Sequence, residues 1–354
     1  MTTTDPVAPA TEPVTELRIE RVDPFDVAGV EAWVDVTTAA LAHEVGDHTT
    51  MWTAPEMLVP LQHPPKSRHE LIFNGTVDGE LVATGWITLP QIDNLVQADL
   101  YVAVLPAHRR RGHGTAMLDF LEQVCRDHGR SRFTGLADWA YDGPVDGRGT
   151  PGLEFALARG FSFALGDVQR ELPLPADGAV LAGLAAEAAP HHDGYELRSW
   201  AGPVPEELVV DYVALDSSLA TEAPTGDLET EAHTADVEAH RTAERVMAAQ
   251  GRATWHTVAL DRDGHVVAYT LLVVPAHDPK WVFQWGTLVH RAHRGHRLGL
   301  AVKVANLRAV QASAQVTGRR VVTWNADVND HMIGINERMG FRPTARAASV
   351  QKKL

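Results

Sequence analysis

Two stretches of the sequence place arginine and glycine between an apolar run and a segment whose apolar residues recur at helical spacing. The first is LYVAVLPAHRRRGHG, from Leu100 to Gly114, and the second is GTLVHRAHRGHRLG, from Gly286 to Gly299. A glycine-rich turn that opens a helix presents free backbone N–H groups and the positive end of the helix dipole to an anion. The added arginines make each turn a candidate pyrophosphate site, and the repetition indicates an internal duplication.

Each turn requires a strand before it and a helix after it, and the sequence predicts both. The runs that enter the turns are apolar and β-branched, which is typical of strands. The segments after the turns carry apolar residues on one helical face, namely Met117, Leu118, Leu121, Val124 and Cys125 in the first copy and Leu300, Val304, Leu307 and Val310 in the second.

The order of strands and helices predicts an α/β (α+β) fold with a mixed, mostly antiparallel sheet flanked by helices, made twice. In the first copy we expect strands at 17–22, 70–77, 81–89, 95–105, 132–137 and 161–172, and helices at 27–43, 55–61, 112–128 and 153–158. In the second we expect strands at 195–200, 252–261, 265–274, 281–290, 320–324 and 342–350, and helices at 206–219, 228–249, 297–316 and 329–339. The predicted organisation is a disordered tail (1–15), one domain (16–172), a linker (173–194) and a second domain (195–354).

Composition narrows the class of protein. The net charge of −15 over 354 residues argues against general nucleic-acid binding, which normally uses a basic face, and favours a cationic small molecule. No apolar run approaches the ~20 residues of a membrane-spanning helix, and the first residues do not resemble a secretory signal. The single cysteine, Cys125, is expected in the core and fits a reducing cytoplasm.

At the level of these motifs the chain resembles the GNAT N-acetyltransferase superfamily. The string R-x-x-G-x-G at Arg109, Gly112 and Gly114 resembles the acyl-CoA pyrophosphate loop, and the second copy departs from it by placing Arg297 where the first glycine is expected. The block TWNADVNDHMIGINERMGF, 323–341, resembles the last conserved block of the superfamily, and LEFALARGF, 153–161, is a weaker counterpart. The tandem arrangement is also distantly similar to that of mycothiol synthase.

The resemblance implies two tandem GNAT domains, each with splayed strands that admit acetyl-CoA as co-substrate, and no metal. It implies that the turn amides bind the pyrophosphate while the preceding strand pairs with the pantetheine arm. Arg297 could point outward and add a phosphate contact, or it could block its loop. The implied CoA-binding residues are Val102, Ala103, Val104, Arg109, Arg110, Arg111, Gly112, His113, Gly114, Thr115, Thr287, Leu288, Val289, Arg294, Gly295, His296, Arg297, Leu298, Gly299, Leu300, Asn325 and Asn329.

Two residues are candidate catalytic groups. Asp99 lies ten residues before Arg109, where many members carry a carboxylate that deprotonates the acceptor ammonium; the alternative is a surface carboxylate. The matching position in the second copy is Gln284, which cannot act as a base. Asn336 occupies the position of the usual tyrosine acid and could donate a hydrogen bond to the sulfur but not a proton. For Asn325, Asn329 and Asn336, helix capping and turn formation are the alternative roles.

The acceptor side is less defined by the sequence. His43 and His48 lack the spacing of a zinc site and are better candidates for substrate contacts. The acidic stretch with Asp227, Glu229, Glu231, Asp236 and Glu238 is either a solvated helix face or a pocket lining that selects cationic acceptors.

The expected activity is a cytoplasmic acyl-CoA-dependent N-acetyltransferase that acetylates a primary amine of a small, cationic acceptor by direct attack. The alternatives are a non-catalytic acyl-CoA sensor and a peptide or protein N-terminal acetyltransferase. We expect a monomer or homodimer whose partner is a small-molecule amine, with no nucleic acid and no membrane. Which copy is catalytic, the acceptor and the acyl length stay open.

Overall fold

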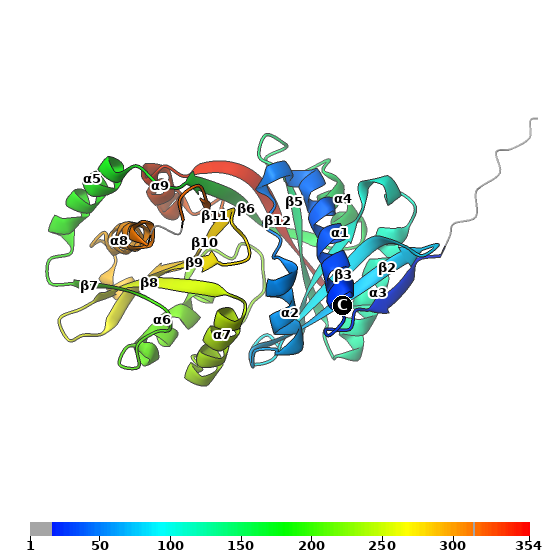
Figure 1. Cartoon of the computed structure of the whole chain (residues 1–354), viewed down its shortest axis with the longest axis horizontal. Helices are drawn as coiled ribbons and strands as arrows, with labels where there is room; N and C mark the ends of the chain where they lie inside the picture. The colour runs from blue at the N-terminus through cyan, green and yellow to red at the C-terminus, as the bar shows by residue number, and fades with distance from the viewer. Residues whose placement is uncertain (1–15, 314–315) are drawn as a thin grey trace, which may run out of the picture.

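The computed structural model describes residues 16–313 and 316–354, and Figure 1 shows two lobes joined by one sheet. The predicted tail 1–15 lies outside the described residues. The first half holds β1 (Arg18–Arg21), α1 (Val27–Val45), α2 (Ala54–Gln62), β2 (Arg68–Val77), β3 (Glu80–Pro90), β4 (Gln97–Val104), α3 (His113–Asp127), β5 (Arg132–Ala140), α4 (Pro151–Ala158) and β6 (Ser162–Pro173).

The second half repeats this order of elements. It holds α5 (Gly178–Ala188), β7 (Glu196–Ala201), α6 (Val209–Glu222), α7 (Val237–Ala249), β8 (Arg252–Leu260), β9 (Val266–Pro275), β10 (Trp281–Val289), α8 (Leu298–Ala312), β11 (Arg320–Ala326), α9 (Asp330–Met339) and β12 (Arg342–Lys353). The predicted fold class is confirmed. Among the described residues, no helix is long and apolar enough to cross a bilayer.

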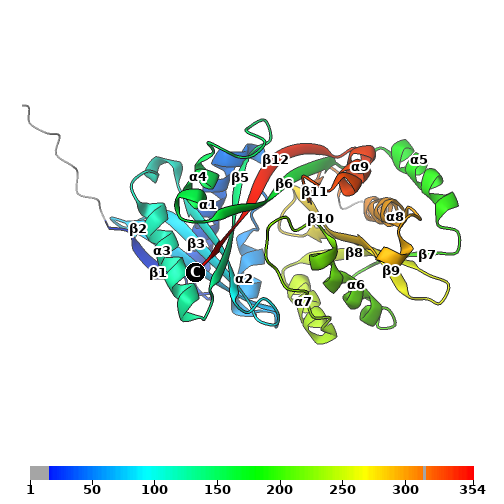
Figure 2. The same cartoon turned by 180° about the vertical axis from the view of Figure 1, so that it is seen from behind.

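The two halves exchange their last strands. The sheet of the described residues has the order β1-β2-β3-β4-β5-β12-β6-β11-β10-β9-β8-β7. The C-terminal strand β12 therefore pairs with β5 of the first half, as at Ala347↔Asp138, whereas β6 pairs with β11 of the second half, as at Asp167↔Ala326. Figures 1 and 2 show β6 and β12 side by side where the lobes meet. Each half consequently receives a strand from the other.

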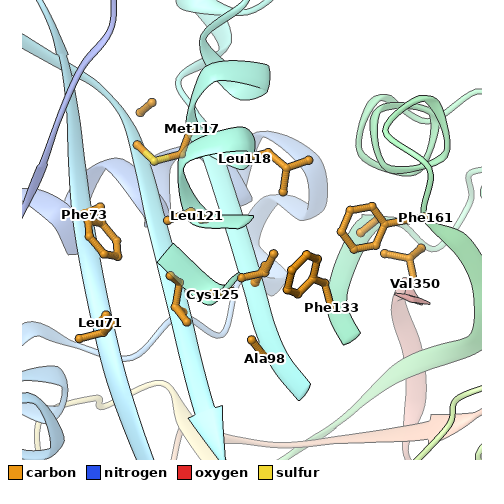
Figure 3. Packing of buried hydrophobic residues seen from close by; sticks show 14 of the residues in the cluster. Leu71, Phe73, Ala98, Met117, Leu118, Leu121, Cys125, Phe133, Phe161 and Val350 are labelled. Carbon is orange, nitrogen blue, oxygen red and sulfur yellow. The ribbon is translucent and has the colours of Figure 1, made fainter. Parts of the chain in front are cut away.

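Helix α3 packs its apolar face on the sheet of the first half. Figure 3 shows Met117, Leu121 and Cys125 of that helix pointing at side chains of the sheet. Val350 of β12 joins the same cluster, so the core of the first half contains a residue from the chain's last strand. Burial raises the pKa of the Cys125 thiol to about 12, which keeps the thiol protonated and fits its predicted place in the core.

Two sequence expectations about connecting segments were incomplete. The predicted linker 173–194 contains the helix α5, whose Leu181 and Leu184 are buried against the core of the second half. The helix predicted over 228–249 begins only at Val237, because Asp236 caps it by accepting the N–H of Ala239. The residues before Asp236 run in an irregular path.

A buried ion pair joins the halves. Glu56 of α2 accepts a hydrogen bond from Arg252 of β8 at 2.8 Å, and both side chains are 1 % exposed. The Arg252 guanidinium also stacks on Trp52, with 3.9 Å from Cζ to the ring centre. Removing one member of such a pair leaves a buried charge without compensation.

Glu56→Gln is therefore expected to lower the free energy of unfolding by about 3–5 kcal/mol, measured by urea denaturation at pH 7. The matched control is Glu238→Gln, which breaks the exposed pair between Glu238 and Lys66 and should leave the stability nearly unchanged. Equal stability of the two variants would contradict a structural role for the buried pair.

Candidate functional site

The two arginine–glycine turns have nearly the same backbone. Each contains two residues in the left-handed region of φ: Arg110 (φ 64°) and Gly112 (φ 88°) in the first turn, Gly295 (φ 89°) and Arg297 (φ 52°) in the second. Glycine thus occupies one left-handed position in each turn, in opposite order. The shape of the turn depends on the backbone conformation at these two positions and not on the residue type. Arginine can therefore occupy the other left-handed position, with a conformational free-energy cost of about 1–2 kcal/mol.

The helices after both turns begin without a capping side chain. Gly112 and Arg297 are the N-cap residues of α3 and α8, and no side chain accepts a hydrogen bond from the first turn of either helix. An Asp or Asn side chain caps α1, α5, α7 and α9, whereas α4 and α6 also begin without one. The free amides at the starts of α3 and α8 are available to an external anion.

The sheet opens beside both turns. In the first half β4 and β5 pair in parallel only as far as Leu100↔Gly135, and in the second β10 and β11 pair only as far as Phe283↔Val322. Beyond these points the strands separate. An extended arm of a ligand could therefore pair with the edge of β4 or β10.

Only one of these two strands is irregular at the opening. The pairing of β10 with β9 shifts register between Gln284 and Thr287, whereas β4 pairs with β3 without a shift. The bulge adds one residue to β10. By distance in sequence from the turn, Gln284 is the counterpart of Asp99. By position in the pairing with the neighbouring strand, β9 or β3, the counterpart of Asp99 is Phe283. A bulge turns backbone groups out of the ladder and leaves them to a ligand.

A cleft of about 980 Å³ lies in the second half between the separated strands and the turn. Its outer end carries Arg294, Arg297 and Arg338, and its inner end carries Thr323 and Asn325. The predicted CoA-binding residues of the second half that line this cleft are Thr287, Leu288, Val289, Arg294, Gly295, Arg297, Leu298, Gly299, Leu300, Asn325 and Asn329. His296 is not among the lining residues, and its ring lies against Tyr195 instead.

The arginines at the outer end are held by carboxylates. Glu222 accepts a hydrogen bond from Arg294 at 2.7 Å, and Glu187 pairs with both Arg297 and Arg338. Arg297 therefore points outward and does not fill its turn. An anionic ligand would replace these carboxylates at an end of the cleft where arginines outnumber them.

The inner cleft contains a carboxylate that the sequence analysis missed. Asp167 belongs to β6, the strand that comes from the first half, and lines the cleft of the second. Burial raises its pKa to about 6, and the neighbouring Asp327 adds to this shift. Nothing in the sequence placed this residue there, because the strand exchange was not foreseen.

A buried lysine lines the same cleft. Lys303 of α8 is 1 % exposed and makes no hydrogen bond or ion pair with the described residues. Burial lowers the pKa of its ammonium to about 7. A signal existed in the sequence, because Lys303 stands three residues after Leu300, close to the apolar stripe of its helix.

The three asparagines divide into different roles. Asn329 caps α9 by accepting the N–H of Met332 at 3.2 Å, which confirms the capping role. It also lines the cleft, and its contact with CoA stays a prediction. Asn336 is fully buried, does not line the cleft, and donates to Asn325 Oδ1 at 2.7 Å. It orients Asn325; a direct contact with sulfur stays a prediction.

The corresponding arginine of the first half is held inside the protein. Arg109 donates to the carbonyl of Val104 at 3.0 Å and pairs with Glu44 of α1, and both side chains are largely buried. Asp99 lies on β4 just before the strands separate and accepts from Gln97 at 3.0 Å. Desolvation by the surrounding protein raises the pKa of Asp99, although the residue remains exposed at the surface. Asp138 of β5 has a pKa of about 7, raised by burial and then by Glu44.

The first-half residues predicted to bind CoA do not line the second-half cleft. They are Val102, Ala103, Val104, Arg109, Arg110, Arg111, Gly112, His113, Gly114 and Thr115. His113 is buried, and its pKa is lowered by burial.

The acidic stretch contacts the first half. Glu229 pairs with Arg132, Asp236 and Glu238 pair with Lys66, and Glu231 accepts the backbone N–H of Asn94. These residues are not among the lining of the second-half cleft, so of the two alternatives considered for the stretch, lining of this cleft is not found.

The two histidines considered for the acceptor side lie before α2. His48 contacts Glu171 at 2.7 Å, and Glu171 also pairs with Arg320. Among the described residues, no group of three His, Cys, Asp or Glu is placed to hold a metal ion.

Comparison with known proteins identifies a family match in part of the chain and a similar fold over nearly all of it. Residues 39–139 match the acetyltransferase (GNAT) family. A tandem GNAT protein from the clavulanic acid biosynthesis pathway superposes with a TM-score of 0.75 at 24 % identity, covering 96 % of this chain and 98 % of its own. A GCN5-related N-acetyltransferase from Sphaerobacter thermophilus gives 0.65 at 17 % identity, covering 95 % of each chain. No curated protein matches the chain.

Proposed function

Because residues 39–139 match the GNAT family and the whole chain has the tandem GNAT fold, which supports acyl-CoA-dependent acetyl transfer in general, we propose that this protein is an N-acetyltransferase whose second half binds acetyl-CoA. The observation that carries the proposal is the second-half cleft. It unites an uncapped helix start, three arginines and a bulged strand at the point where the sheet opens.

Each part of the cleft has a chemical task in this proposal. The free amides of α8 and the arginines bind the pyrophosphate. The edge of β10 pairs with the pantetheine arm, and backbone N–H groups near the bulge polarise the thioester carbonyl and stabilise the oxyanion. The acceptor nitrogen then attacks the carbonyl directly while both substrates are bound.

Asp167 takes the proton from the acceptor ammonium. Its pKa of about 6 leaves it ionised at neutral pH yet basic enough to accept a proton. The acceptor is a small primary amine, and its positive charge is attracted by Asp167 and by the net charge of −15. This assignment replaces Asp99, which lies on the first-half sheet.

The family match and the cleft fall in different halves. The match covers residues 39–139 of the first half, where the turn keeps the glycine pattern at Gly112 and Gly114. In that half, however, the paired arginine is more buried: Arg109 is 24 % exposed, whereas Arg294, which pairs with Glu222, is 52 % exposed. In addition, β4 has no bulge. We assign the first half a supporting role: it supplies β6, and with it Asp167, to the second-half cleft.

Titration calorimetry is expected to show one acetyl-CoA per chain with a Kd in the micromolar range or below, about 8 kcal/mol. Free CoA release should then follow the addition of small amines in a thiol assay. Two equivalent binding sites would contradict the assignment to the second half.

The same assay separates the alternatives. Binding without turnover across an amine panel would identify an acyl-CoA sensor, and turnover restricted to peptides would identify an N-terminal acetyltransferase. An absence of binding in calorimetry and in thermal shift would remove the proposal.

A further inference from the structure

Lys303 is a buried cation without a partner. Its side chain is 1 % exposed, it lines the second-half cleft, and it forms no ion pair or hydrogen bond with the described residues. The ring of Phe341 lies 5.8 Å from its Nζ. A lysine buried for packing alone would be replaced at little cost by an apolar residue, so the position calls for a ligand group that uses the amine.

The charges around the cleft do not compensate it. The charged or titratable residues that line the cleft with Lys303 are Asp167, Glu222, His293, Arg294, Arg297, His331 and Arg338. Neither carboxylate in this set pairs with Lys303: Glu222 pairs with Arg294, and Asp167, whose pKa is raised by burial and then by the charge of Asp327, forms no ion pair among the described residues. The pKa of Lys303 is lowered by burial alone, so near pH 7 the amine exists in both protonation states.

The proposed reaction produces a group that requires such an amine. When an amine displaces CoA, the leaving sulfur carries away an electron pair as a thiolate, and a buried thiolate needs a proton or a cation. Asn336 cannot supply a proton, because an amide only donates hydrogen bonds, and it already donates to Asn325. Thr323 and Asn325, which also line the cleft, are likewise not acids. His293 lies in the arginine–glycine turn before α8 and His331 in the first turn of α9, whereas Lys303 lies further along α8.

We propose that Lys303 is the general acid of the second-half cleft and protonates the leaving CoA thiolate. This inference rests on the proposed function. Helix α8 starts at the turn, and Lys303 lies five residues further on, about 7 Å along the helix. Its side chain lines the same cleft as Trp285 of β10 and Thr323 of β11, the two strands between which the thioester end of the arm would lie.

The step balances as follows. The acceptor ammonium first loses one proton to Asp167, and the free amine forms a bond to the carbonyl carbon. The C–S bond then breaks, its electron pair goes to sulfur, and the proton of Lys303 Nζ passes to sulfur. The nitrogen loses its second proton to water, the neutral lysine regains one from water, and Asp167 releases the proton that it accepted to solvent. The products are the amide, the CoA thiol and one proton.

The central test is Lys303→Met, which keeps the length of the side chain and removes the amine. Its kcat with acetyl-CoA is expected to fall roughly 10²–10³-fold with little change in the Kd for acetyl-CoA. Lys352→Met is the matched control: its Nζ lies 5.6 Å from Phe161, the first-half counterpart of Phe341, but pairs with Glu122. This control should keep wild-type kcat.

A second measurement separates an acid from a packing residue. An acetyl thioester of an acidic aryl thiol releases a stable thiolate, so with this donor the loss in Lys303→Met should shrink to less than about tenfold. In addition, the thiol of bound CoA, followed by thiolate absorbance, should titrate at lower pH in the wild type than in the variant. Circular dichroism and thermal melting verify that the variant is folded.

Several outcomes would overturn the inference. The first is a wild-type kcat in Lys303→Met, and the second is an equal loss of kcat with both thioesters. A third is an acetyl group on Lys303 detected by mass spectrometry, which would make the lysine a nucleophile. A fourth is a defect confined to donors with a carboxylate in the acyl group, which would make the lysine a binding group for that carboxylate. If the wild type binds CoA but acetylates no amine, the proposed function fails instead, and the thiol titration still decides whether Lys303 contacts the sulfur.

Discussion

Gly299→Glu is expected to weaken acetyl-CoA binding roughly 100-fold or more, about 2.7 kcal/mol, whereas Gly114→Glu leaves it intact. Both residues follow the left-handed positions of their turns and lie in the first turn of α8 or α3. A glutamate at Gly299 would bring a negative charge to the free amides that the pyrophosphate needs. The same change at Gly114 affects the turn whose arginine is paired with Glu44.

The two glycines form a matched pair of sites. A Cβ at Gly299 would lie 3.6 Å from Val289 and 3.7 Å from Ile335, and a Cβ at Gly114 would lie 3.5 Å from Phe155 and 3.6 Å from Val104. A Cβ thus makes only ordinary contacts at either position, and because Gly299 is buried and Gly114 half-buried, thermal melting must confirm that both glutamate variants are folded. Gly299→Ala is the size control and should bind acetyl-CoA within a few-fold of the wild type.

Calorimetry and turnover with a small amine give the readout for all three variants. If Gly114→Glu abolishes binding while Gly299→Glu preserves it, the halves have been assigned in the wrong order. If both variants lose half of the binding stoichiometry, each half carries its own site.

The sequence was sufficient for what depends on local backbone. The turns, the helices after them and the Asn-to-Gly-Phe block are specified by residues close in sequence, so they could be predicted with few errors in their bounds. Even the replacement of a glycine by Arg297 can be understood locally, since Gly295 takes over one of the two left-handed positions. The equivalence of the two turns is thus better expressed by backbone conformation than by residue type.

The strand exchange could not be predicted in the same way. A strand such as β6 carries the same alternation whether it pairs within its own half or with β11, because pairing partners leave no local mark. Two consequences followed. Asp167 was not connected with the second half, and the stretch around Glu229 was read as a helix instead of a segment bound to Arg132. Lys303, in contrast, could have been noticed as a charge close to an apolar stripe.

The exchange also changes what the duplication means for the reaction. If each half were self-contained, the first half, whose β4 has no bulge, would have no part in the proposed reaction. Because β6 pairs with β11 and its Asp167 lines the second-half cleft, the proposed site needs the first half even if that half binds no CoA itself. The acetyl-CoA elements and the candidate base then come from different halves of one chain, and neither half alone forms the complete site.

The base is tested by Asp167→Asn, which is expected to lower kcat roughly 10²–10⁴-fold and to leave the Kd for acetyl-CoA nearly unchanged. The wild-type kcat should rise with pH through about 6, where the carboxylate ionises, and this dependence should be lost in the variant. Asp99→Asn is the matched control, because it also removes a carboxylate of raised pKa from a strand, but in the first half.

Stability supplies an independent check that the Asp167→Asn variant is folded. The pKa of Asp167 is raised from 3.8 to about 6 in the folded chain, so the folded state binds more protons than the unfolded state between these values and loses stability as the pH rises through them. At pH 7 the variant should therefore be more stable than the wild type, by on the order of 2 kcal/mol, and this gain should vanish below pH 4. A variant that is stabilised in this way yet keeps wild-type kcat would show that Asp167 is buried without acting as the base. A large loss in Asp99→Asn would instead return the catalytic role to the first half.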